Sequence, residues 1–253
     1  MRVIRAFVGA PLAIGARLAL PEAAAAHLVR VLRLREGDDC VLFNGDGHDY
    51  PARIVAAGKR ETLVEVHARQ AVDNESPLRI TLLQGIARGE KMDLILQKAT
   101  ELGVARIVPV EAERTEVRLD GARMEKRLAH WRSVVASACE QCGRARVPEV
   151  ADPAAIAAVA AHADSAALKL TLDPAGPHGL SSLALPATGD AGARIAIAIA
   201  IGPEGGWSPR DRGQLQAAGF EGLGLGPRIL RTETAGLAAI AALQALHGDL
   251  RGD

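Results

Sequence analysis

The feature that most constrains the fold is an alternation of short apolar runs with amphipathic helical segments after Pro77. Strand-length apolar runs occur at residues 78–83, 105–110, 166–172, 194–201 and 222–225, and helix-period segments at 91–102, 123–141, 154–161, 209–218 and 235–246. Runs that are apolar throughout are typical of strands buried on both faces of a parallel sheet. Strands that alternate with helices in this way predict an α/β domain.

The N-terminal part of the chain has a different pattern. Strands are predicted at residues 2–8, 39–44, 49–57 and 62–68, with one Ala-rich helix at 21–32 and turn residues at 44–47. These elements predict a small, mostly β unit of barrel size, and the polar stretch 70–77 is interpreted as a linker. We therefore expect two domains, residues 1–72 and 73–253.

Composition excludes several classes of protein. No apolar run reaches the roughly 20 residues that span a bilayer, so no membrane partner is expected. The N-terminus has no long apolar stretch of a signal peptide, and three cysteines do not make a disulfide framework, which together favour a cytoplasmic protein. Lys plus Arg and Asp plus Glu number 30 each, so binding of a polyanion would depend on a local basic face.

The sharpest motif is IAIGPEGGWSPRD at residues 199–211, where a buried strand runs into a glycine-rich turn and then a helix. Ser208 is a natural N-cap, Pro209 suits the first helical position, and Asp211 completes a capping box. Glycines at the carboxyl end of a strand let a ligand approach the backbone closely. A tight turn without a ligand is the alternative interpretation of this motif taken alone.

A second motif, LGLGPRILRTETAG at residues 223–236, also ends a strand in a Gly-Pro turn and leads into a helix. Two such turns on consecutive strands predict a shared crevice at the carboxyl edge of the sheet. Neither motif has the G-x-G-x-x-G spacing of a dinucleotide site or the G-K-[ST] of a P-loop. Cys139 and Cys142 have no second pair and no well-spaced histidines, so no metal site is expected.

Together these two motifs resemble the SPOUT superfamily of knotted methyltransferases, and within it the RsmE family of 16S ribosomal RNA uridine-N3 methyltransferases. Further matching segments are HLVRVLR at 27–33, QKATELGV at 97–104 and EQCGR at 140–144. The resemblance covers nearly the whole chain. It implies an α/β C-terminal domain with a trefoil knot and a small N-terminal PUA-like β-barrel for RNA.

The resemblance also implies S-adenosylmethionine as the cofactor, a homodimer, and 16S ribosomal RNA, within the small ribosomal subunit, as the substrate. Carried over residue by residue, the cofactor would be held by Leu172, Ile201, Gly202, Pro203, Glu204, Gly205, Leu225, Gly226, Ile229, Leu230 and Thr234.

Methylation of a ring nitrogen that carries a proton requires the proton to leave while negative charge spreads onto the flanking carbonyl oxygens. Arg231 is the first candidate to stabilise that charge and Arg228 the second. Glu233 and Glu204 are both candidates to accept the proton. A simple ion pair between Arg231 and Glu233 at the helix start is the alternative to a catalytic role.

A cluster of basic residues in the N-terminal unit predicts a face that grips RNA phosphates. Its members are Arg2, Arg5, Arg30, Arg33 and Arg35, and Arg88 and Lys91 extend the set. An ordinary solvated helix face is the alternative. Two rival functions also stay open, namely a SPOUT enzyme for another RNA or base atom and a non-catalytic RNA-binding ribosome-assembly factor.

Overall fold

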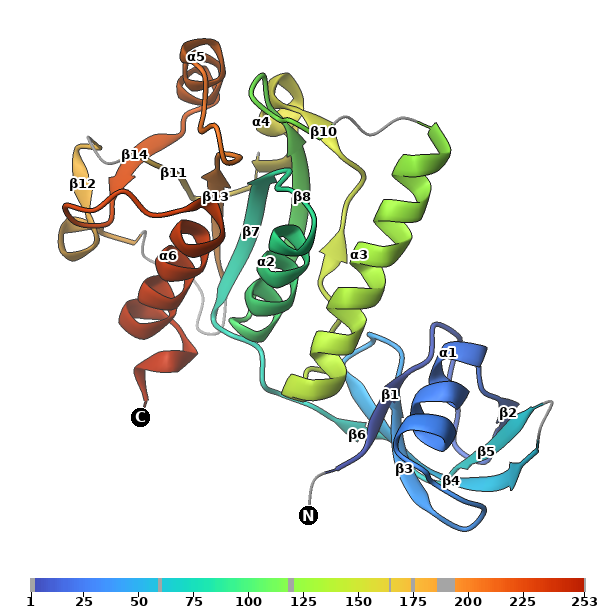
Figure 1. Ribbon diagram of the computed structural model, residues 1–253. Coiled ribbons are helices and arrows are strands. Elements are labelled where there is room, and N and C mark those ends of the chain that lie inside the picture. The colour runs from blue at the N-terminus through green and yellow to red at the C-terminus, as the bar shows by residue number, and fades with distance from the viewer. Residues whose placement is uncertain are drawn as a thin grey trace. The chain divides into compact units, whose positions relative to one another are not determined.

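The computed structural model describes residues 3–58, 61–117, 121–163, 165–173, 176–185 and 194–252. The chain divides into two compact units (Figure 1). The first contains residues 1–75 and, unexpectedly, 136–147, which include the C-terminal end of helix α3 (Gly121–Cys142). The second contains residues 76–135 and 148–253. The domain prediction, with one boundary after residue 72, did not include residues 136–147 in the first unit.

The first unit is built on one small sheet. Its strands are β1 (Arg5–Phe7), β2 (Arg17–Ala19), β3 (Asp39–Phe43), β4 (His48–Ala57), β5 (Thr62–Val66) and β6 (Gln70–Ala71), in the order β1-β3-β4-β5-β2 with β6 on β4. β1 is parallel to β3 and the other pairs are antiparallel. Helix α1 (Glu22–Ala25) continues into a π-helix (Ala26–Val31), and Leu28 packs into the core with Leu42, Ile54 and Val64.

A buried ionic cluster ties residues 136–147 to the first unit. Arg5 pairs with Asp49, donates to the carbonyl of Arg144 at 3.0 Å, and has a side chain that is 7% exposed. The Arg144 guanidinium donates two hydrogen bonds to Glu75, at 2.9 and 2.6 Å. The expectation that Arg5 grips phosphates is therefore wrong, because its charge is buried and paired. The stretch 70–77 is likewise more than a linker, since Glu75 completes this cluster.

The second unit contains a parallel sheet of eight strands. They are β7 (Leu78–Gly85), β8 (Arg106–Glu111), β9 (Glu149–Val150), β10 (Ala154–Ala155), β11 (Leu168–Leu172), β12 (His178–Gly179), β13 (Ile195–Ile201) and β14 (Glu221–Gly224). Their order is β10-β8-β7-β13-β11-β14-β12, with β9 on β8. Every pairing is parallel, as the apolar runs predicted.

Strand β13 shows how side-chain size sets the layers around the sheet. It alternates isoleucine and alanine, and successive residues of a strand face opposite sides. Ala198 and Ala200 pack with Trp207 and with Leu215 of helix α5 (Pro209–Ala217). On the other side, Ile201 meets Gly236 of helix α6 (Thr232–His247). Small residues therefore admit large partners on one face, and large residues meet a glycine on the other.

Two helices lie next to each other on the sheet face that Ile201 occupies. Helix α2 (Glu90–Glu101) contacts α6, and α6 in turn contacts β7 and β13 (Figure 1). Gln244 of α6 fixes this arrangement, because its amide accepts from Ser76 at 2.6 Å and donates to the carbonyl of Leu102 at 2.8 Å. None of the helices in the described ranges is long and apolar enough to cross a membrane.

Two helix predictions need correction. The segment predicted as a helix at 154–161 begins as strand β10, paired with the edge of β8, and becomes helical through a 3-10 turn (Ile156–Ala158) and α4 (Val159–Ala163). The last helix begins at Thr232 rather than at residue 235, and Arg231 is its N-cap without a side-chain capping bond. This earlier start changes which residues of the second motif face the cavity described below.

Gly85 lies where two backbone segments of the second unit come close together. A Cβ at Gly85 would lie 2.4 Å from the backbone nitrogen of Pro203. We predict that Gly85→Ala lowers the free energy of unfolding by about 1–3 kcal/mol, since backbone atoms have to move. Gly213→Ala is the control, because Gly213 lies in α5 with no atom within 4 Å of its Cβ position, and alanine favours helix. Urea denaturation measures both, and equal stability of the two variants would contradict the packing.

Candidate active site

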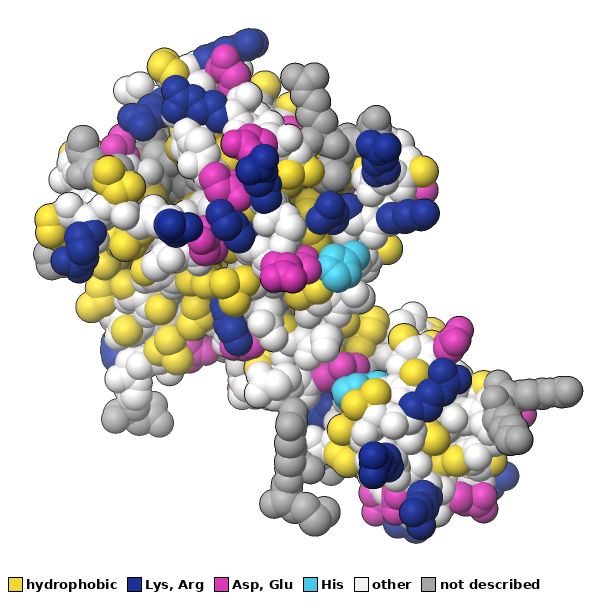
Figure 2. All heavy atoms as spheres, viewed as in Figure 1, with side chains coloured by type: hydrophobic (Ala, Val, Ile, Leu, Met, Phe, Trp, Pro, Cys, Tyr) yellow, Lys and Arg dark blue, Asp and Glu magenta, His cyan; other side chains and the backbone are white. Residues whose placement is uncertain are grey.

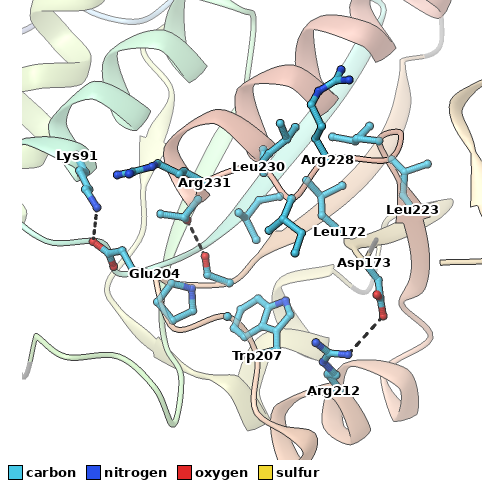
Figure 3. A pocket seen from close by; sticks show the side chains of 18 residues that line it. Lys91, Leu172, Asp173, Glu204, Trp207, Arg212, Leu223, Arg228, Leu230 and Arg231 are labelled. Atoms are coloured by element: carbon cyan, nitrogen blue, oxygen red, sulfur yellow. Dashed lines mark hydrogen bonds and ion pairs between the residues drawn. The ribbon is translucent and has the colours of Figure 1, made fainter. Parts of the chain in front are cut away.

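A cavity of about 540 Å³ lies where three neighbouring parallel strands, β11, β13 and β14, reach their carboxyl ends. Its volume is in the range of small-molecule sites. The two glycine-rich motifs follow β13 and β14 and form most of its wall (Figure 3). The crevice predicted from the pair of motifs is therefore present at this edge of the sheet.

Most residues expected to bind a cofactor line this cavity. They are Leu172, Ile201, Gly202, Pro203, Glu204, Leu225, Ile229 and Leu230. The candidates Arg228 and Arg231 line it as well. Trp207 and Leu223 add to the apolar surface, although the sequence did not single them out.

Three expected cofactor residues do not line the cavity. Gly205 packs against Arg114, whose Nη1 donates to the Gly205 carbonyl at 3.0 Å and whose Cβ would lie 3.0 Å from a Cβ at Gly205. Gly226 has a φ of +83° and serves the turn itself. Thr234 lies with Glu233 in a different groove, between α2 and α6. Because α6 begins at Thr232, that residue occupies the place expected for Thr234.

Thr232 joins three separate segments beneath the cavity. Its side chain is buried, and its hydroxyl donates to the Gly202 carbonyl at 2.6 Å. The same oxygen accepts from Nε2 of the fully buried Gln84, at 3.0 Å. Gln84 also donates to the carbonyl of Gly85 at 2.9 Å. Thus the end of β7, the glycine turn and the start of α6 share one hydrogen-bond network.

The opposite side of the glycine turn is fixed by its tryptophan and by a capped helix. Trp207 Nε1 donates to the hydroxyl of Thr171 at 3.0 Å, and that hydroxyl donates to the carbonyl of Ala200 at 3.2 Å. Ser208 and Asp211 form the predicted capping box of α5. Both faces of the turn are therefore held by hydrogen bonds within the chain.

One end of the cavity carries a cluster of opposite charges. Glu204 accepts from the backbone N–H of Arg88 at 3.0 Å and from Lys91 Nζ at 3.4 Å (Figure 3). Partial burial raises the pKa of Glu204, but these bonds outweigh it and hold that pKa below its usual value. Lys91 Nζ also lies 4.0 Å from Glu233. Glu204 is therefore ionised at neutral pH, with Lys91 between the two carboxylates.

Arg228 and Arg231 keep their charges available. Neither takes part in the ion pairs formed within the described part of the chain, and both are exposed at the cavity. Glu233 faces Lys91 rather than Arg231. A simple ion pair between Arg231 and Glu233, the alternative considered from the sequence, is therefore not formed.

The residues predicted to contact RNA fall into three groups: exposed on the first unit, ion-paired, or lining the cavity. Arg30, Arg33 and Arg35 are exposed on the first unit. Arg88 pairs with Glu116 at 2.6 Å, and Lys91 lines the cavity. Arg2 lies outside the described residues. Asp173 and Arg212, which the sequence did not single out, also line the cavity.

Two family models match this chain. One, described as an RNA methyltransferase domain, matches residues 74–244, and the other, an RNA methyltransferase PUA domain, matches residues 20–66. Ribosomal RNA small subunit methyltransferase E of Buchnera aphidicola (subsp. Schizaphis graminum) is 31% identical over 98% of each chain. The enzyme of the same name from Bacillus subtilis is 30% identical over 90% of this chain and 89% of its own.

Solved structures agree with these matches. Ribosomal RNA small subunit methyltransferase E from Neisseria gonorrhoeae, bound to S-adenosyl methionine, is 40% identical, with a TM-score of 0.87 over 98% of this chain and 99% of its own. A methyltransferase from Legionella pneumophila, in complex with the cofactor SAM, is 37% identical, with a TM-score of 0.91 over 98% and 100%.

The Thr232 network makes a prediction about stability. Thr232→Val keeps the shape of the side chain but leaves the Gly202 carbonyl and the Gln84 amide without their partner, so the free energy of unfolding should fall by about 1–3 kcal/mol. Thr232→Ser, which keeps the hydroxyl, should lose less. Chemical denaturation of both variants checks the order. A valine variant as stable as the original protein would show that the hydroxyl bonds contribute nothing.

Proposed function

This chain belongs to the family of ribosomal RNA small subunit methyltransferases E, and we propose that it methylates N3 of a specific uridine in 16S ribosomal RNA with S-adenosylmethionine. The observation that carries the proposal is the cavity at the carboxyl edge. Its wall contains an ionised glutamate and Arg228 and Arg231, which have no ion pair within the part of the chain that the structure describes. The small ribosomal subunit in the cytoplasm is the proposed setting.

The residues of the cavity fit the proposed cofactor. Leu172, Leu223, Leu225 and Leu230 offer aliphatic surface to a flat heterocycle such as adenine. Within the described ranges, the backbone of residues 225–230 forms no hydrogen bond, so its amide and carbonyl groups are available to a ligand. Such groups give a polar ligand orientation and specificity in an otherwise apolar pocket.

When bound, S-adenosylmethionine supplies an electrophilic methyl group. The residues of the chain have to orient the uracil and to stabilise the negative charge left on the base when the N3 proton departs. We propose that Arg231, with Arg228 beside it, donates hydrogen bonds to the uracil carbonyl oxygens. Fixed positive charge at those oxygens stabilises the anionic base and lowers the pKa of N3.

Of the two proton acceptors considered, we favour Glu204. It lines the cavity, whereas Glu233 lines the groove between α2 and α6. The low pKa of Glu204 keeps it ionised, which makes it ready to accept a proton but weak as a base. We therefore propose that proton removal depends mainly on the arginines, which lower the pKa of N3.

RNA contacts outside the cavity are proposed for the first unit. Arg30, Arg33 and Arg35 are exposed there, and among the described residues no carboxylate is ion-paired with them. They are therefore available to phosphates. The unit includes the residues matched by the PUA model, which supports this role.

We also propose that the C-terminal part of the second unit is a trefoil knot. Strand β13 lies between β7 and β11, and after β14 the chain returns so that α6 packs on β13 and β7. Thr232 is bonded to the turn after β13. These crossings support a threaded path through residues 202–206 and 225–231.

A homodimer is proposed through the groove between α2 and α6. Figure 2 shows hydrophobic side chains gathered over these helices. The groove is lined by Leu94, Leu102, Leu237, Ala238 and Ala241, and Leu94 is 42% exposed. Contiguous exposed apolar surface is typical of interaction sites.

Sedimentation velocity should give a dimer, and Leu94→Glu should shift it toward monomer, because a charge would be buried at the interface. A 26.4 kDa species at every concentration would contradict the proposal.

Methyl transfer tests the function directly. Small subunits that lack the modification, incubated with the protein and labelled cofactor, should yield N3-methyluridine on nucleoside analysis. A methyl group on another base atom, or none with intact cofactor binding, would favour the rival interpretations: a related enzyme of different specificity or a non-catalytic assembly factor.

Arg231→Ala should reduce turnover by about 100-fold or more, as loss of a charge-stabilising donor does in other enzymes. Cofactor affinity, measured by calorimetry, should stay within about threefold, because the proposed contacts of Arg231 are to the base. Arg35→Ala, on the first unit, should instead weaken RNA binding without lowering turnover at saturating RNA. Full turnover by the Arg231 variant would remove this residue from the mechanism.

A further inference from the structure

The loop at residues 112–116, which directly follows β8, contacts the glycine turn after β13. Its Arg114 donates from Nη1 to the Gly205 carbonyl at 3.0 Å, although neither residue lines the cavity. A Cβ at Gly205 would lie 3.0 Å from the Arg114 Cβ, so the loop and the turn are closely packed. The loop therefore meets the turn one residue after Glu204.

The backbone around Arg114 is itself fixed by hydrogen bonds. The Ala112 N–H donates to the Thr115 hydroxyl at 2.9 Å, and the Thr115 N–H donates to the Ala112 carbonyl at 3.0 Å. The Glu113 N–H donates at 3.3 Å to Oδ2 of Asp211, which is buried in the capping box of α5. The Arg114 side chain therefore extends from a backbone that is bonded on both sides of it.

A second contact connects the same loop to the carboxylate of Glu204. Arg88 Nη2 lies 2.6 Å from Glu116 Oε2, and the backbone N–H of Arg88 donates to Glu204 Oε1 at 3.0 Å. The Arg88 and Glu116 side chains are 66% and 51% exposed, so this ion pair adds little to the stability of the fold. Loop 112–116 nevertheless supports Glu204 at two places, near its carboxylate and at the next peptide.

Glu204 is the residue through which this loop can affect a reaction in the cavity. Its side chain is 23% exposed and lies beside Lys91 at the cavity wall (Figure 3). A glutamate has several rotatable bonds, so its carboxylate stays in one place only where its surroundings hold it. Because Arg114 does not line the cavity, its effect on a base bound there has to pass through a residue that does.

We propose, on the premise of the function proposed above, that Arg114 is a positioning residue for removal of the N3 proton. By fixing the Gly205 carbonyl, its guanidinium keeps the Glu204 carboxylate directed at the base. The proton passes from N3 to an oxygen of Glu204, and the electron pair of the N–H bond stays on the base. Such a transfer requires the acceptor within hydrogen-bond reach of the proton, so a displaced carboxylate slows the reaction.

A double-mutant cycle between Arg114 and Glu204 tests the assignment. Arg114→Met keeps the aliphatic part that packs on Gly205 but lacks the donor, and Glu204→Gln keeps the shape of the side chain but accepts no proton. In single turnover at saturating RNA and cofactor, Arg114→Met should slow N3 methylation by about 10–100-fold and Glu204→Gln by about 100-fold or more. In the double variant, Arg114→Met should add less than about twofold, because its effect passes through the missing carboxylate.

Binding measurements separate positioning from other roles. The dissociation constants for S-adenosylhomocysteine and for the RNA should each stay within about threefold in Arg114→Met, a change of less than 1 kcal/mol. Arg210→Met is the matched control, since Arg210 is exposed on α5, carries the same charge and does not line the cavity. It should leave rate and affinities unchanged. If circular dichroism shows that Arg114→Met does not fold, Glu116→Gln carries the same cycle, with a smaller loss because its ion pair is exposed.

Additive losses in the double variant, or full activity of Glu204→Gln, would show that Arg114 does not act through this carboxylate. A loss confined to cofactor or RNA affinity would make Arg114 a framework or binding residue instead. Each of these results overturns the assignment while leaving the proposed function intact. Absence of methyl transfer to N3 by the unaltered protein would overturn both.

Discussion

The cavity depends on one close contact, the passage of the 202–203 backbone across Gly85 at the end of β7. No side chain fits at Gly85, because a Cβ would come within 2.4 Å of the Pro203 nitrogen. The hydroxyl of Thr232 stabilises this contact, because it is hydrogen-bonded to the Gly202 carbonyl and to Gln84. The turn after β13 is therefore fixed to both β7 and α6, beside the cavity at the carboxyl ends of β11, β13 and β14.

Charged side chains occupy more than one place around this space. The Lys91–Glu204 pair suits an anionic transition state, and so do Arg228 and Arg231, which form no ion pair with any residue of the described ranges. Charges fixed in advance need no reorganisation during the reaction. Asp173 and Arg212 line the same cavity on the side away from Lys91 (Figure 3). The neutral net charge of the chain is consistent with such local charges, since recognition depends on local fields rather than on overall charge.

Much of the α/β unit was predictable, because continuous apolar runs such as β13 have few alternatives to a buried parallel strand. The crevice was predictable for the same reason, since two glycine turns follow strands that end at one edge. What the sequence did not reveal depends on contacts between distant segments. Thr232 was missed because the start of α6 carries no side-chain cap, and Arg5 was misjudged because its partner Asp49 lies 44 residues away. Residues 136–147 could not be assigned to the first unit by any local pattern.

The central claim is that the cofactor occupies the cavity at the carboxyl edge of β11, β13 and β14. The chain has two tryptophans, of which Trp207 lines that cavity and Trp131 is buried in α3. Fluorine NMR of protein labelled with 5-fluorotryptophan, with resonances assigned through Trp131→Phe, reports on both at once. Titration with S-adenosylmethionine should shift the Trp207 resonance saturably and leave that of Trp131 in place. An unmoved Trp207 resonance under conditions where calorimetry detects binding would contradict the account.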